Sequence, residues 1–261
     1  MARELEVALE AATAAGQMLS ENFGREQAVR FKGEVDLVTE VDERAERVIR
    51  EVLLGAFPAY GVLGEEGGWS RGGGGEGARW IVDPLDGTTN YAHGLPLFCV
   101  YIALERSGEV VLGVVHDPTA EETYAAESGG GAELNGRPLR VSDTGEPIRA
   151  LVGSGLPYER EHLPAALELF GRLAALTQGT RRLGSVALAL CYVAAGRLDG
   201  YYERGPKASW DVAAGALLVE EAGGRVTDYR GDKLDLGGGE VAASNGGLHP
   251  FLVGETGAGD R

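Results

Sequence analysis

The chain has 261 residues, of which 44% are hydrophobic and 25% are charged, and this composition excludes a disordered chain. Forty Asp and Glu residues against 24 Lys and Arg residues give a formal net charge of −16. That charge disfavours nucleic acid and acidic membranes as partners, because both are polyanionic. No stretch approaches the roughly 18 to 20 apolar residues of a membrane span. We therefore expect a cytoplasmic protein without a membrane partner.

The first half of the chain predicts two helices followed by strands. Residues 4–22 carry apolar side chains at helical spacing, and a second helix is expected from Asp42 to Phe57, before Pro58. The glycine-rich stretch 67–77 has no hydrophobic period and predicts a surface loop. An antiparallel meander is then expected from strands near residues 80–82, 98–104, 110–115 and 123–126.

After about residue 150, strands and helices alternate. Strands are expected near 151–154, 181–183, 200–203 and 241–244, and helices at 161–176, 185–195 and 211–222. The change of pattern predicts one domain over residues 1–261 with two subdomains, approximately 1–145 and 146–261, and a site in the cleft between them. Cys99 and Cys191 lie in apolar surroundings and are expected to be free, buried thiols.

The strongest chemical signal is the segment 80–93, which has the sequence WIVDPLDGTTNYAH. Asp83 and Asp86 follow a buried strand, where unpaired carboxylates are costly and a hard divalent cation such as Mg²⁺ would satisfy them. The N–H groups of Gly87, Thr88 and Thr89 are expected at a helix N-terminus, which favours anions. Metal and phosphate sites would then adjoin, although this segment alone is also explained as a turn with capping carboxylates.

Other acidic segments accompany this one. Glu65 and Glu66 follow a short apolar strand, acids recur from Asp36 to Asp42, and Asp211 lies in the first turn of an expected helix. There the helix dipole favours the ionised carboxylate. Each segment alone is also explained as a solvated loop or a helix cap.

Together these segments resemble the inositol monophosphatase family. Residues 80–93 and 210–224 resemble its two signature motifs, the Glu65 and Asp36–Asp42 segments match it as well, and the resemblance covers about residues 5–250. It implies an α/β (α+β) fold, a layered α-β-α-β-α sandwich of the inositol monophosphatase and fructose-1,6-bisphosphatase type. It also implies a homodimer that hydrolyses small phosphomonoesters with two or three Mg²⁺ ions and is often inhibited by Li⁺.

The resemblance assigns metal ligands residue by residue. It implies that Glu65, Asp83 and the Leu85 carbonyl bind one Mg²⁺ ion. A second ion would be bound by Asp83, Asp86 and Asp211, so that Asp83 bridges the two. Paired cations about 3.5–4 Å apart can activate a water and stabilise the leaving alkoxide.

The other expected site residues surround the phosphate. The resemblance makes Asp42 and Thr88 the residues that orient the attacking water, and it makes Glu65 a catalytic residue as well as a metal ligand. It makes the N–H groups of Gly87 and Thr88 the phosphate site. Gly184, Ser185 and Glu203 would face the alcohol, but Glu203 lies one position farther from Asp211 than in the best-known animal members. For Asp42, helix capping alone is the alternative.

Several functions stay open at this point. The leading hypothesis is an inositol-1-monophosphatase, and the alternatives within the superfamily act on fructose 1,6-bisphosphate, histidinol phosphate or 3′-phosphoadenosine 5′-phosphate. An alternative of another class is a catalytically weak sugar-phosphate-binding or regulatory module, and a third is a purely structural cation site. Residues 68–72 fit a nucleophile elbow only formally, because a glycine run follows where a helix is required.

Overall fold

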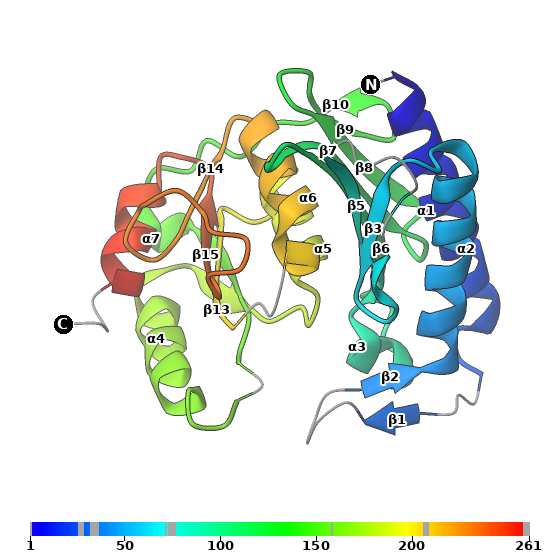
Figure 1. Cartoon of the computed structure of the whole chain (residues 1–261). Coiled ribbons are helices and arrows are strands. Elements are labelled where there is room, and N and C mark those ends of the chain that lie inside the picture. Colours follow the sequence, from blue (N-terminus) through cyan, green and yellow to red (C-terminus); the bar gives the residue numbers. More distant parts are fainter. Residues whose placement is uncertain are drawn as a thin grey trace.

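The computed structural model describes residues 2–25, 29–31, 37–70, 72, 77–157, 159–205 and 209–257. Figure 1 shows five alternating layers of helices and sheets. The order is a helix pair, an eight-stranded sheet, a second helix pair, a five-stranded sheet and a third helix pair. The layered α-β-α-β-α sandwich expected from the sequence is therefore confirmed.

The three helical layers differ in how much of each helix is buried. The outer pair beside the large sheet is α1 (Ala2–Asn22) and α2 (Glu40–Ala56), the middle pair is α5 (Val186–Ala194) and α6 (Ser209–Glu221), and the other outer pair is α4 (Leu163–Leu176) and α7 (His249–Thr256). The middle helices are apolar on all sides, as is required of helices between two sheets. Gly215 of α6 allows close contact, because a Cβ there would lie 2.5 Å from Leu190 Cδ1.

The large sheet has the strand order β10-β9-β8-β7-β6-β5-β3-β4. Its strands pair antiparallel except for β3 with β5, so the expected meander is confirmed. The strands are β3 (Gly61–Gly64), β4 (Gly68–Ser70), β5 (Ala78–Asp86), β6 (Cys99–Arg106), β7 (Glu109–Asp117), β8 (Glu122–Glu127), β9 (Gly131–Leu134) and β10 (Arg137–Pro138). The register of β5 against β6 shifts between Asp83 and Asp86, around Pro84, which has no N–H to donate.

The smaller sheet has the order β12-β11-β13-β15-β14. Strand β11 runs parallel to β12 and β13, and the remaining pairs are antiparallel. Its strands are β11 (Leu151–Ser154), β12 (Gly179–Arg181), β13 (Gly200–Arg204), β14 (Arg225–Thr227) and β15 (Glu240–Ser244). The other elements are the hairpin of β1 (Val29–Phe31) and β2 (Leu37–Thr39), helix α3 (Thr88–Ala92) and a 3₁₀ turn, Pro147–Arg149.

One buried cluster joins the two halves of the sequence. It includes Ile81 and Tyr101 of the large sheet, Leu190 and Leu218 of the middle helices, and Val241 of the smaller sheet. Helices α5 and α6 thus cover the large sheet although they belong to the second half of the chain. The division into subdomains near residue 145 stays a prediction.

Some local predictions need correction. The stretch 67–77 is not a loop throughout, because Gly68–Ser70 forms β4 and pairs antiparallel with β3. The pairing arises from tertiary contact: a Cβ on Gly61 would lie 2.3 Å from Trp69 Cη2, so the indole covers a glycine of the neighbouring strand. The strand expected at 181–183 lies at Gly179–Arg181. Asp36 and residues 73–76, which include three of the four consecutive glycines at 72–75, lie outside the described residues.

The expectation for the two cysteines holds. Cys99 and Cys191 are free and buried, as predicted. Among the helices of the described residues, none has both the length and the apolar character of a membrane span.

Candidate active site

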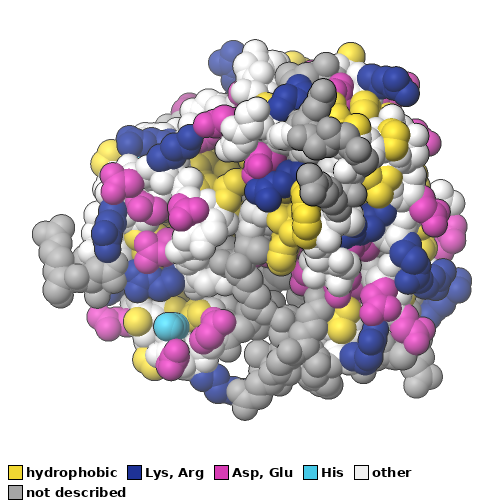
Figure 2. All heavy atoms as spheres, viewed as in Figure 1, with side chains coloured by type: hydrophobic (Ala, Val, Ile, Leu, Met, Phe, Trp, Pro, Cys, Tyr) yellow, Lys and Arg dark blue, Asp and Glu magenta, His cyan; other side chains and the backbone are white. Residues whose placement is uncertain are grey.

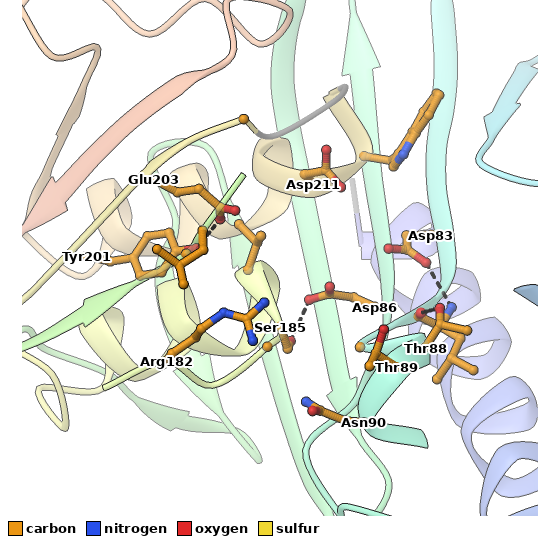
Figure 3. A pocket seen from close by; sticks show the side chains of 18 of the residues that line it. Asp83, Asp86, Thr88, Thr89, Asn90, Arg182, Ser185, Tyr201, Glu203 and Asp211 are labelled. Carbon is orange, nitrogen blue, oxygen red and sulfur yellow. Dashed lines mark hydrogen bonds between the residues drawn. The ribbon is translucent and has the colours of Figure 1, made fainter. Parts of the chain in front are cut away.

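A pocket of about 290 Å³ lies where the two sheets and the middle helices meet. The end of β5, the start of α3, the segment before α5, the end of β13 and the first turn of α6 line it (Figure 3). On the face of the molecule in Figure 2, acidic and basic side chains are interspersed. Carboxylates converge in the pocket instead: Glu65, Asp83, Asp86, Glu203 and Asp211 all line it.

Asp83 is the most deeply buried of these acids, with 3% of its surface exposed. Its Oδ1 accepts a hydrogen bond of 2.9 Å from the Leu85 N–H, which folds the side chain back over the irregular end of β5. Burial raises the pKa of Asp83 well above its usual range, and repulsion from Glu65, Asp86 and Asp211 raises it further. The four predicted acidic ligands are therefore near enough to repel one another.

Asp86 connects β5 to the N-terminus of α5. Its Oδ2 accepts a hydrogen bond from Ser185 Oγ at 2.5 Å (Figure 3) and another from Ala187 N at 2.8 Å. Burial raises the pKa of Asp86 to about 6, although these hydrogen bonds favour the ionised form. Ser185 is also the N-cap of α5, since it accepts from Leu188 N at 3.1 Å. Ser185 thus lies in the pocket as predicted, but its hydroxyl contacts a predicted metal ligand.

Asp42 and Thr88 are brought together from distant parts of the sequence. The Thr88 hydroxyl lies 3.2 Å from Asp42 Oδ1 and 3.0 Å from the Leu85 carbonyl oxygen, both of which can accept from it. Asp42 Oδ2 also accepts from the Thr39 N–H at 2.9 Å and completes the capping box of α2. The capping role and the contact with Thr88 therefore coexist, one on each carboxylate oxygen.

Gly87 and Gly184 adopt backbone conformations that favour glycine. Gly87 precedes α3 with φ 96°, and a Cβ there would lie 2.7 Å from the Leu97 carbonyl oxygen. Gly184 has φ 78°, and a Cβ there would lie 2.9 Å from Asn90 Nδ2. Both glycines line the pocket, so they allow the backbone to approach its interior.

Glu203 lies on the opposite wall from Asp83 (Figure 3). The Tyr201 hydroxyl donates a hydrogen bond to Glu203 Oε2. Burial raises the pKa of Glu203 to about 8, with Asp211 and Asp86 adding repulsion, whereas Arg182 lowers it. Glu203 packs directly against the backbone of Gly155, because a Cβ at that position would lie 1.9 Å from Glu203 Cδ.

Several pocket residues were not identified from the sequence. Asn90 Nδ2 donates to the Leu97 carbonyl at 2.7 Å and to the Leu183 carbonyl at 2.8 Å, and so joins α3 to the segment before α5. Tyr201 also lines the pocket, where its hydroxyl donates to Glu203. Asn90 stands in the signature segment, but its partner Leu183 is 93 positions away and no local pattern indicates it.

The residues at the pocket fit a divalent cation. In the part of the chain that the structure describes, no group of three or more His, Cys, Asp and Glu side chains is arranged so that it could hold a metal ion as it stands. The donor atoms nevertheless suit a hard divalent cation, because the carboxylates of Glu65, Asp83, Asp86 and Asp211 and the Leu85 carbonyl are all oxygen donors. Buried carboxylates that raise one another's pKa gain from a cation that favours their ionised form.

Comparisons with known proteins agree with this geometry. Residues 1–258 match the model of the inositol monophosphatase family. A protein of Rhizobium meliloti called inositol-1-monophosphatase is 47% identical over 249 residues, which cover 92% of this chain and 91% of the relative. The Nus factor SuhB of Pseudomonas aeruginosa is 45% identical over 248 residues, with the same coverage of 92% and 91%.

Solved structures give the same result. The inositol monophosphatase of Anabaena superposes with a TM-score of 0.87 at 41% identity, covering 97% of this chain and 95% of that one. The Thermotoga maritima enzyme described as an IMPase gives a TM-score of 0.91 at 36% identity, covering 100% and 98%. The chain therefore belongs to the inositol monophosphatase family and is a metal-dependent phosphatase.

Proposed function

We propose that the protein is a Mg²⁺-dependent inositol-1-monophosphatase. The observation that carries the proposal is the convergence of Glu65, Asp83, Asp86 and Asp211 on one pocket, beside Gly87 and Thr88 at the start of α3. The relatives called inositol-1-monophosphatase in Rhizobium meliloti and Mesorhizobium japonicum, 47% and 48% identical, support inositol 1-phosphate as the substrate.

In this proposal Glu65, Asp83 and the Leu85 carbonyl would hold one ion, and Asp83, Asp86 and Asp211 would hold a second. When bound, such cations supply Lewis acidity and neutralise the charge of the phosphate. The Gly87 and Thr88 N–H groups donate to phosphate oxygens.

Thr88 and Asp42 orient the attacking water, and Asp42 is placed to receive a proton through the Thr88 hydroxyl, which lies 3.2 Å away. The water oxygen attacks phosphorus and gives one proton to the Thr88–Asp42 pair. The bond from phosphorus to the ester oxygen breaks, and the leaving alkoxide takes a proton from solvent to become the alcohol. Gly184, Ser185 and Glu203 face that alcohol, and Glu203 is held for this task by Tyr201.

Other parts of the proposal concern the whole molecule. We expect two or three Mg²⁺ ions per site, a homodimer in solution and a cytoplasmic location. The two subdomains, approximately residues 1–145 and 146–261, each contribute residues to the pocket.

A regulatory binding function is the second candidate. It is favoured by the Nus factor SuhB of Pseudomonas aeruginosa, whose identity of 45% is close to that of the relatives called phosphatases. The complete acidic set favours catalysis, because a protein that only binds a partner has no need of four mutually repelling carboxylates.

The test is phosphate release from inositol 1-phosphate, fructose 1,6-bisphosphate, histidinol phosphate and 3′-phosphoadenosine 5′-phosphate, with Mg²⁺ and with EDTA. We expect release from inositol 1-phosphate that needs Mg²⁺ and is lost in Asp83→Asn. Asp143→Asn, at an exposed position, is the matched control and should keep wild-type activity. Negligible release from every compound by the wild type would refute the proposal.

A further inference from the structure

A buried ion pair on α2 lies behind the turn that carries Glu65. The Glu46 side chain is 3% exposed and its Oε1 lies 2.6 Å from Arg50 Nε, one helical turn farther along. Glu46 Oε2 accepts from the Glu66 N–H at 2.8 Å, and Oε1 accepts from the Gly67 N–H at 3.0 Å. The two N–H groups that directly follow Glu65 are thus both bound to one carboxylate.

The turn is closely fitted to this carboxylate. A Cβ on Gly64 would lie 2.4 Å from Glu46 Oε1, and a Cβ on Gly67 would lie 2.6 Å from the same oxygen. The glycines on either side of Glu65 and Glu66 therefore allow the backbone to close on Glu46. The Glu65 N–H itself donates to the Val82 carbonyl at 3.1 Å, one residue before Asp83.

Arg50 extends the contact to the next strand. Its Nη1 donates to Ser70 Oγ at 2.6 Å and its Nη2 donates to the Gly68 carbonyl at 2.7 Å. Ser70 Oγ in turn lies 3.3 Å from the Val62 carbonyl oxygen in β3. The Glu46–Arg50 pair therefore holds both the turn and the strands on either side of it.

One face of helix α2 therefore contacts two parts of the predicted site, Thr88 and the turn that carries Glu65. Asp42 and Glu46 are one turn apart and point the same way, because side chains at i and i+4 share a face. Asp42 lies against Thr88, whereas Glu46 holds the turn of Glu65. A merely stabilising ion pair would not explain this arrangement, since buried pairs often stabilise no better than apolar residues.

We infer that Glu46 is a positioning residue, which holds Glu65 in the orientation needed for metal binding through the N–H groups of Glu66 and Gly67. Arg50 keeps the Glu46 carboxylate in place. The inference rests on the proposed function, because it takes Glu65 to be a metal ligand. Partners that orient metal ligands typically change metal affinity by about 10- to 100-fold when they are replaced.

The experiment compares Glu46→Gln and Arg50→Lys with the wild type. Glu46→Gln keeps the size of the side chain but replaces one acceptor by an NH₂ group facing a backbone N–H. We expect the Mg²⁺ concentration for half-maximal activity to rise about 10- to 100-fold, with activity at saturating Mg²⁺ nearly unchanged. Mn²⁺ binding measured by calorimetry should weaken equally, and amide exchange at Glu66 and Gly67 should accelerate.

Glu51→Gln is the matched control, since Glu51 is an exposed acid of the same helix, and it should behave as the wild type. Wild-type metal affinity in both Glu46→Gln and Arg50→Lys, even with a lowered Tm, would overturn the inference and leave a structural role. Arg50→Lys keeps the charges and provides the test if Glu46→Gln does not fold. A wild type that neither binds Mn²⁺ nor releases phosphate would instead refute the proposed function, and the inference with it.

Discussion

Replacing Glu203 by Gln should make the metal-free protein more stable at alkaline pH. Glu203 is 7% exposed, and burial raises its pKa from 4.5 in the unfolded chain to about 8 in the folded protein. Between these values the folded state binds more protons than the unfolded state, so the free energy of unfolding falls as pH rises. Above about pH 8 Glu203 is ionised in both states, and the whole cost of burying its charge lowers the free energy of unfolding.

The structure bounds the size of this effect. One proton contributes about 1.4 kcal/mol per pH unit, so the window from 4.5 to about 8 corresponds to at most about 5 kcal/mol. Gln has no charge to bury, and its carbonyl oxygen can still accept from the Tyr201 hydroxyl. We expect Glu203→Gln to exceed the wild type by about 1–5 kcal/mol at pH 8.5 and to lose most of that advantage at pH 5.

Urea unfolding in EDTA at a series of pH values measures this directly, and EDTA removes the contribution of bound cations. Glu133→Gln, at an exposed position in β9, should change stability little at any pH. A Glu203→Gln variant that is less stable than the wild type at pH 8.5, or whose advantage does not depend on pH, would refute the reasoning. The same variant should raise KM for inositol 1-phosphate, because Glu203 faces the alcohol in the proposed function.

Three further predictions concern packing, acid stability and metal binding. Gly155→Ala places a Cβ 1.9 Å from Glu203 Cδ, so it should lower the free energy of unfolding by about 1–3 kcal/mol. Gly145→Ala is the control, because there is open space around Gly145. Equal urea midpoints for the two variants would contradict the prediction. His249 is buried between two hydroxyls and its pKa is lowered to about 4, so the folded state binds fewer protons between pH 6.5 and 4. Stability should therefore fall by about 1.4 kcal/mol per pH unit as pH decreases through that window, and unfolding of His249→Gln should show a flatter dependence. Mg²⁺ should raise the Tm of the wild type, by an amount equivalent to about 2.7 kcal/mol at 100 times Kd, and EDTA should reverse it. A shift of the same size in Asp83→Asn would show that the ion binds elsewhere.

Sequence patterns predicted the elements whose signals are local. The opening helix has a clear period, and the meander from β5 to β8 has short apolar runs separated by turns. Asp83, Asp86 and Asp211 could be identified as candidate metal ligands, because each stands at the end of a strand or the start of a helix. Such positions can be located from the sequence.

The residues that the sequence did not reveal act over long separations. Glu46 resembles any acid on an amphipathic helix, yet it binds backbone N–H groups 20 and 21 positions away. Asn90 reaches a carbonyl beyond the middle of the chain. Strand β4 has no β-branched residues and exists because β3 offers it a partner. Such contacts depend on tertiary structure, which no local period encodes.

The middle helices have a consequence for how the protein is made. Helices α5 and α6 lie late in the sequence, yet they cover one face of the large sheet, whose strands are synthesised first. When only about the first 150 residues have emerged from the ribosome, the apolar face of that sheet would therefore be exposed to solvent. Such surfaces are prone to aggregation until their cover arrives. During translation the first half should therefore need a chaperone or the ribosome surface until α6 emerges.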